Sequence, residues 1–131
     1  MNILIADDHA LVRLGLREIL ADALPDAFFS EAGNGDEVLA QLARSEYSAL
    51  LLDLNMPGRS GLDVLTDVKR MYARLPVIMV SVHPEDQYAS RCLSAGASAY
   101  VCKDRAPEEL ARTTKNILSG DSGVQGSMLI H

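Results

Sequence analysis

Five short apolar runs, separated by longer amphipathic stretches, constrain the fold of this chain more than any other feature of its sequence. Several runs are apolar at consecutive positions, which is typical of parallel strands covered by helices on both faces of a sheet. We therefore predict five strands, at residues 2–6, 28–32, 49–53, 77–81 and 98–102.

Apolar residues recur at helical spacing between these runs and predict amphipathic helices. The predicted core-facing residues are Val12, Leu16, Ile19, Leu20, Val38, Leu39, Leu42, Val64, Leu65, Val68, Met71, Ala89, Cys92 and Leu93. Gly96 is a suitable cap for the fourth helix. The last helix should begin with Pro107-Glu108-Glu109 and run to about Gly120, because a first turn favours proline and acidic residues. A strand followed by a helix, repeated five times, predicts a doubly wound α/β fold.

Length and composition narrow the class of protein. A chain of 131 residues fits one domain, which we assign to residues 1–120. Residues 121–131 contain two glycines and two serines without a clear period, so we interpret them as a linker or a fraying end. No apolar run approaches the ~20 residues of a bilayer span and the N-terminus does not resemble a signal peptide, so we expect a cytoplasmic protein.

Charge and cysteine content add two expectations. Cys92 and Cys102 should be reduced core thiols, since two cysteines form no disulfide framework. The net charge of −6 and the pI near 4.9 argue against this chain binding nucleic acid by itself, because phosphate contacts usually need a basic face.

Polar side chains follow the predicted strands, at the ends where ligands collect in an open parallel sheet. Asp7 and Asp8 follow the first strand, Asp53 ends the third, Ser81 ends the fourth and Lys103 follows the fifth. Taken singly, the aspartates could be helix caps, the serine a turn residue and the lysine a solvated charge. Because all of them fall at one edge of the sheet, the sequence favours a functional site.

The chemistry of these groups indicates phosphoryl transfer. Clustered carboxylates repel each other, and Mg²⁺ suits one or two carboxylates that leave positions for water and phosphate oxygens. A carboxylate can also be the nucleophile that forms an aspartyl phosphate. A metal ion and Lys103 would then stabilise the phosphoryl group from two sides, and Ser81 could donate a hydrogen bond to it.

The order of these residues resembles the receiver domain of response regulators over about residues 2–119. The residues that carry the resemblance are Asp7-Asp8, Asp53, Asn55-Met56-Pro57-Gly58, Gly61, Ser81, Tyr100 and Lys103-Asp104. The resemblance implies that Asp53 is the phospho-acceptor, and that Asp8, Asp53 and the backbone carbonyl of Asn55 are direct Mg²⁺ ligands.

The remaining residues receive roles from the same resemblance. Asp7 would act on the metal through water, and Lys103 would pair with the phosphoryl group. Ser81 would move toward that group, and Tyr100 would be the aromatic residue that rotates when Ser81 moves.

Finer details resemble the NarL/FixJ (LuxR-type) regulators, namely Asp7-Asp8-His9, Leu11-Val12-Arg13, Gly15-Leu16, Gly96-Ala97 and Tyr100-Val101-Cys102-Lys103-Asp104. Many receivers have a proline after the lysine; Asp104 stands there in this chain and disfavours a cis peptide bond. Cys102 is interpreted as a small core residue, and His9 as structural, because Mg²⁺ prefers oxygen ligands. His83 lies in the loop after Ser81 and is expected to shape access to the site.

The resemblance implies a flavodoxin-like parallel sheet in the order 2-1-3-4-5, with helices on both faces. It implies a switch and not a turnover enzyme: the domain catalyses transfer from the phosphohistidine of a sensor histidine kinase to Asp53, and phosphorylation shifts its conformation. It also implies that transcription is controlled by a helix-turn-helix domain beyond residue 131, through which alone DNA is bound.

Two other classes of protein fit these residues less well. A haloacid dehalogenase-type phosphatase also uses an aspartyl nucleophile, but it should have a second acid two residues later, where this chain has Asn55. A flavodoxin-like flavin binder should offer hydroxyls and amides after the first strand, whereas Asp7 and Asp8 would repel a phosphate.

Leu11 and Leu14 lie away from the core-facing residues of the first predicted helix, at ~100° per residue. Single exposed leucines are normal. Because the fold places this helix beside the last one, we expect weak self-association through Leu11 and Leu14 across a two-fold axis, strengthened by phosphorylation.

Overall fold

All five predicted strands are present in the computed structural model, which describes residues 1–83, 85–103 and 107–120. The strands are β1 (Asn2–Ala6), β2 (Phe28–Ala32), β3 (Ala49–Asp53), β4 (Val77–Ser81) and β5 (Ala99–Cys102). The helices are α1 (Ala10–Ala23), α2 (Gly35–Arg44), α3 (Gly61–Met71), α4 (Glu85–Ser94) and α5 (Pro107–Leu118). The fifth strand begins at Ala99, one residue later than predicted. The linker prediction for residues 121–131 and the peptide-bond prediction at Asp104 lie outside the described residues.

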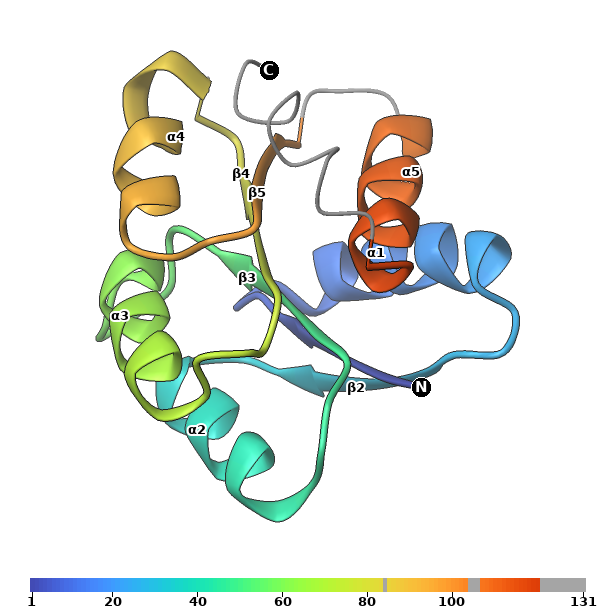
Figure 1. Cartoon of the computed structure of the whole chain (residues 1–131), viewed down its shortest axis with the longest axis horizontal. Helices are drawn as coiled ribbons and strands as arrows, with labels where there is room; N and C mark the ends of the chain where they lie inside the picture. The colour runs from blue at the N-terminus through green and yellow to red at the C-terminus, as the bar shows by residue number, and fades with distance from the viewer. Residues whose placement is uncertain (84, 104–106, 121–131) are drawn as a thin grey trace.

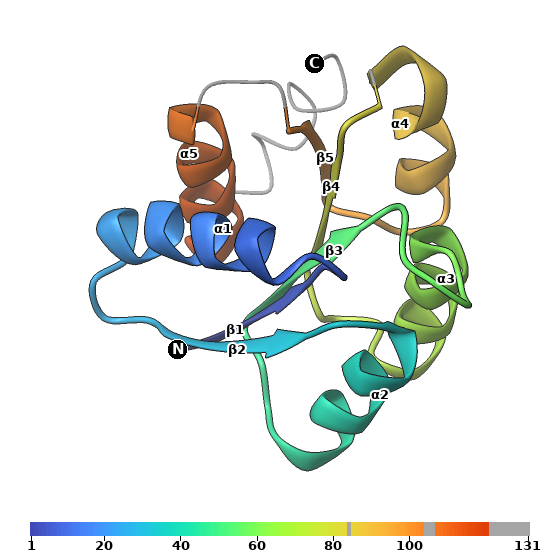
Figure 2. The ribbon, with the colours of Figure 1, turned by 180° about the vertical axis from the view of Figure 1, so that it is seen from behind.

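The described strands form one parallel sheet in the order β2-β1-β3-β4-β5, as the resemblance implied. Helices α1 and α5 cover one face, and α2, α3 and α4 cover the other (Figures 1 and 2). The fold is therefore the predicted flavodoxin-like doubly wound sheet.

Alternate strand residues face the two helical layers, which gives the protein two core clusters. Ile3, Ile5 and Leu51 pack with Leu20 of α1 and Leu110 of α5. The opposite cluster holds the intervening strand residues with the apolar sides of α2, α3 and α4; its members include Leu4, Leu50, Leu52, Met79, Val38, Val64, Val68 and Cys92. Burial of one such aliphatic side chain contributes about 1.5–3 kcal/mol, so both faces stabilise the sheet.

Local sequence sets the ends of several helices. The side chain of Asn34 accepts a hydrogen bond from Glu37 N at the start of α2, and Ser60 Oγ accepts one from Asp63 N at the start of α3. Gly96 follows α4 with a φ of 111°, a left-handed conformation that suits the predicted glycine cap.

The predicted core residues are buried or half-buried, with the exception of Met71. That prediction is wrong: Met71 is 52% exposed. It is the last residue of α3, and Tyr72 and Leu75, which follow the helix, pack against the core in its place.

The state of the two cysteines and the character of the helices bear on two expectations drawn from the sequence. Cys92 and Cys102 are both free and buried, as expected. Among the described residues, no helix has the length and apolar character that a bilayer crossing requires.

Candidate functional site

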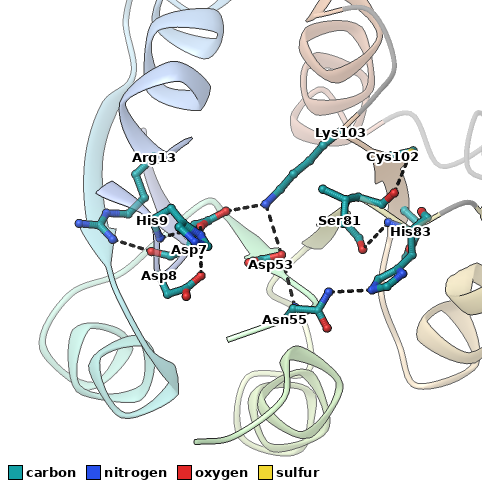
Figure 3. A network of polar contacts seen from close by, with 12 residues as sticks. Asp7, Asp8, His9, Arg13, Asp53, Asn55, Ser81, His83, Cys102 and Lys103 are labelled. Atoms are coloured by element: carbon teal, nitrogen blue, oxygen red, sulfur yellow. Dashed lines mark hydrogen bonds and ion pairs between the residues drawn. The ribbon is translucent and has the colours of Figure 1, made fainter. Parts of the chain in front are cut away.

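The predicted site residues converge at the C-terminal edge of the sheet, where the loops after β1, β3, β4 and β5 meet (Figure 3). Asp7 and Asp8 follow β1, while Asp53 and Ser81 are the last residues of β3 and β4. Lys103 follows β5 and reaches across the edge toward the carboxylates (Figure 3). The parallel sheet thus gathers side chains that lie up to 96 positions apart in sequence.

Lys103 lies between two buried carboxylates. Its Nζ donates to Asp7 Oδ2 at 2.8 Å and lies 3.4 Å from Asp53 Oδ1. Asp7 is fully buried and Asp53 is 5% exposed. Burial raises the pKa of the Asp53 carboxyl; the Lys103 charge opposes that rise, and the Asp7 carboxylate adds to it. The ammonium therefore keeps two mutually repelling carboxylates together.

We call the cluster of Asp7, Asp8, Asp53 and Lys103 the acidic pocket; Asp8 is its most exposed member. Its side chain is 27% exposed, and its Oδ1 lies 3.0 Å from Nδ1 of the exposed His9. Neither aspartate caps α1: the N-cap residue is His9, and Asp7 Oδ1 accepts the His9 N–H at 2.9 Å. The ligand atoms of Asp7, Asp8 and His9 all lie within 4.8 Å of one another, which is the spacing of a candidate cation site.

The loop after β3 approaches the pocket closely. Asn55 N donates to Asp53 Oδ1 at 3.4 Å, and Gly61 N donates to Leu54 O at 2.7 Å. A Cβ at Gly61 would overlap the Asp53 carbonyl oxygen and lie 2.7 Å from Leu54 Cα. Glycine is required at position 61 because the start of α3 lies directly against the end of β3.

His83 joins three parts of the site. Its ring Nε2 accepts a hydrogen bond from Asn55 Nδ2 at 2.8 Å, on the side of Asp53 away from Asp7 and Asp8 (Figure 3). Its backbone N–H donates a hydrogen bond to Ser81 Oγ at 3.0 Å, and its backbone carbonyl accepts one from Tyr100 OH at 3.0 Å. Ser81 is fully buried and Tyr100 is 4% exposed. The two predicted switch residues therefore contact the same backbone.

The sequence identified the acids, the hydroxyl and the lysine, and the structure brings all of them together. It did not predict the Asn55–His83 contact, although each residue stands two positions after a site residue at a strand end. It also did not predict that Lys103 pairs with Asp7, or that Arg13 donates to the Asp7 carbonyl. Arg13 belongs to the Leu11-Val12-Arg13 segment that resembles the NarL/FixJ regulators, but its spacing in the sequence gave it no role.

The family pattern described as the response regulator receiver domain matches residues 3–115. The chain therefore belongs to the response regulator receiver domain family. Within that family it is a NarL/FixJ (LuxR-type) receiver, as the sequence resemblance implied. It is 34% identical over 122 residues to the nitrate/nitrite response regulator protein NarL of Escherichia coli strain K12, a match that covers 92% of this chain and 56% of NarL.

Solved structures have the same fold. A LuxR-family two-component response regulator from Aurantimonas sp. SI85-9A1 superposes with a TM-score of 0.84 at 28% identity, covering 91% of this chain and 85% of that one. The response regulator TrrA of Thermotoga maritima, in complex with Mg²⁺-BeF, superposes with a TM-score of 0.79 at 28% identity, covering 88% and 97%. The chain spans 55–58% of the length of these curated relatives.

Proposed function

We propose that this receiver is a phosphorylation-dependent switch whose Asp53 accepts a phosphoryl group from the phosphohistidine of a sensor histidine kinase in a Mg²⁺-dependent transfer. The observation that carries the proposal is the Lys103 ammonium between Asp7 and Asp53 in a buried acidic pocket. Such a group stabilises the negative charge of a phosphoryl group attached to Asp53.

The residues of the site supply the steps of the transfer. A carboxylate oxygen of Asp53 attacks phosphorus as the bond from phosphorus to the kinase histidine breaks. Lys103 is close enough to Asp53 Oδ1 to neutralise one phosphoryl oxygen, and Ser81, at the end of the neighbouring strand, would donate to another. The domain catalyses this reaction on itself and is not a turnover enzyme.

The acidic pocket suits Mg²⁺ as the cofactor. Asp8, Asp53 and the Asn55 carbonyl offer the hard oxygen ligands that Mg²⁺ prefers, with Asp7 acting through water. Lys103 offsets only part of the repulsion among three carboxylates: burial and the Asp7 carboxylate still leave the pKa of Asp53 raised. A bound Mg²⁺ would neutralise negative charge on the transferred group.

The phosphodonor experiment tests the function. Incubation with Mg²⁺ and acetyl phosphate should add one labile phosphoryl group, measured by intact mass, and chelation of Mg²⁺ should prevent it. Continuous release of phosphate without an adduct would indicate a phosphatase instead, and retention of flavin on the purified chain would indicate a flavin binder.

Mg²⁺ should stabilise the folded protein, because it binds the assembled pocket and not the unfolded chain. At one hundred times its dissociation constant the gain is about 2.7 kcal/mol, seen as a higher Tm. Asp8→Ala should remove most of this gain, while Asp26→Ala, at an exposed aspartate outside the pocket, should keep it. Equal stabilisation of the Asp8 variant and the parent would show that Asp8 is not a ligand.

Ser81 and Tyr100 should form a two-position switch. A phosphoryl group draws the Ser81 hydroxyl away from His83 N, the loop shifts, and the Tyr100 hydroxyl loses its His83 carbonyl. Crystal structures with and without Mg²⁺ and beryllofluoride should show both hydrogen bonds exchanged. Unchanged Ser81 and Tyr100 conformations in the two structures would contradict the switch.

The wider assignment rests on longer relatives, of which this chain spans a little more than half. We place the receiver in the cytoplasm, in a transcription regulator whose DNA contacts are made by a LuxR-type output domain outside this chain. The net charge of −6 supports a division in which the receiver does not itself bind DNA.

Self-association should involve the outer side of α1. Leu11 and Leu14 are 80% and 48% exposed, and α1 lies beside α5 (Figures 1 and 2). Beryllofluoride, which mimics a phosphoryl group, should strengthen a dimer of the parent, and Leu14→Glu should weaken that dimer. Sedimentation velocity of the parent and the variant, each with and without beryllofluoride, measures both effects. If the variant associates as strongly as the parent, a different surface forms the dimer.

A further inference from the structure

Arg13, near the start of α1, lies behind the acidic pocket and is bound on two sides. Its Nη1 donates to the Asp7 carbonyl at 2.5 Å, and its Nε donates to Glu31 Oε1 at 2.8 Å. The side chain is only 18% exposed. Figure 3 shows the guanidinium reaching back toward Asp7, on the side of the carboxylates away from Lys103.

The Asp7 carbonyl is a significant anchor because it belongs to the peptide group that joins Asp7 to Asp8. A peptide group is planar, so holding its oxygen fixes the direction of the chain through both residues. The Asp7 carboxylate is also held by Lys103 and His9 N. For the Asp8 carboxylate, the described residues provide an ion-pair contact with His9, whose side chain is 70% exposed. The backbone anchor therefore matters most for Asp8.

The hydrogen bond to Glu31 fixes the position of the Arg13 guanidinium, which in turn holds the Asp7–Asp8 peptide group. It lies on β2, opposite Ile5 of β1, and the same end of β2 accepts the Asp7 N–H through Ala32 O at 3.0 Å. The hydrogen bond from Arg13 lowers the pKa of the Glu31 carboxyl, which keeps the pair charged. The planar guanidinium bonds both acceptors at once, which a lysine ammonium does less well.

We propose that Arg13 is a positioning residue for the metal site: by holding the Asp7–Asp8 peptide against β2, it sets the Asp8 carboxylate for Mg²⁺. This inference rests on the proposed Mg²⁺ site. The direction in which the Mg²⁺ affinity changes when Arg13 is removed distinguishes this role from a simple charge effect. A positive side chain near a cation site disfavours Mg²⁺ by repulsion, so removing it should strengthen binding if charge decides. If positioning decides, removing it should weaken binding.

The experiment compares Arg13→Met with Arg17→Met by calorimetric titration of the full chain with MgCl₂, and measures unfolding by urea without metal. Both variants lose one positive charge from α1 and one contact with Glu31, but Arg17 bonds Glu31 without touching Asp7. We expect Arg13→Met to bind Mg²⁺ about tenfold more weakly than the parent, as is usual when the partner of a ligand is lost. Arg17→Met should stay within twofold of the parent.

A second variant guards against a general loss of structure. Arg13→Lys keeps the charge and the apolar stem; folded, it should still bind Mg²⁺ several-fold more weakly than the parent. Affinity equal to or tighter than that of the parent, in either folded Arg13 variant, overturns the proposal. If the parent binds Mg²⁺ and Asp8→Ala does not, such a result refutes the role of Arg13 alone. A parent that does not bind Mg²⁺ refutes the metal site and this inference together.

Discussion

Asp53→Asn should abolish the phosphoryl adduct. The amide is similar in size to the carboxylate and can occupy the same buried place, but its oxygen is a far weaker nucleophile. Its neutrality also removes the penalty of a buried charge, which shows in the raised pKa of Asp53. The variant should therefore fold with a Tm at least equal to that of the parent while losing the reaction. Loss of the reaction at this position should therefore occur without loss of stability.

The measurement is intact mass after incubation with Mg²⁺ and acetyl phosphate, with the Tm of each variant recorded beside it. Asp26→Asn is the matched control, because it makes the same substitution at an exposed aspartate and should be labelled like the parent. Labelling of the Asp53 variant at the parental rate would show that a different residue is phosphorylated.

Gly61→Ala should cause the largest loss of stability among single-methyl changes in the site. The added Cβ would overlap the Asp53 carbonyl oxygen and lie 2.7 Å from Leu54 Cα and 2.9 Å from Asp53 C. Backbone atoms cannot move aside as a flexible side chain can, so α3 must shift away from β3. Overpacking of this kind costs about 3 kcal/mol, or a fall in Tm on the order of 10 °C.

Gly15→Ala provides a control for which the expected change in stability has the opposite sign. A Cβ at Gly15, inside α1, would meet nothing within 4 Å. Alanine is favoured over glycine in a helix interior by about 1 kcal/mol, so this variant should be more stable than the parent. Thermal unfolding of the two variants and the parent measures both effects. A Gly61 variant as stable as the parent would show that the start of α3 does not lie against Asp53 as described.

The sequence predicted the sheet well because the five apolar runs coincide with strands that are covered on both faces. Asp7, Asp53 and Ser81 could be assigned because strand ends alone determine where they lie. The prediction that Met71 faces the core was wrong because periodicity does not indicate where a helix ends. Tyr72 and Leu75 take its place in the core.

The contacts that the sequence missed depend on the direction of side chains between separate loops. Asn55 and His83 lie 28 positions apart, and their meeting depends on the paths of two loops that no period describes. The contact of Arg13 with Asp7 was equally hard to predict, because its acceptor is a backbone carbonyl and every residue has one. Such contacts leave no pattern of residue types, so they could be found only from coordinates.

His83 contacts the site both through its backbone and through its side chain. Its N–H and carbonyl link Ser81 to Tyr100, and these groups are present whatever side chain stands at position 83. The imidazole contacts Asn55, whose backbone N–H donates to Asp53 Oδ1. If Asp53 is phosphorylated as proposed, we expect a change of the His83 side chain to alter the surroundings of the phosphoryl group and its lifetime, and to leave the connection to Tyr100 in place.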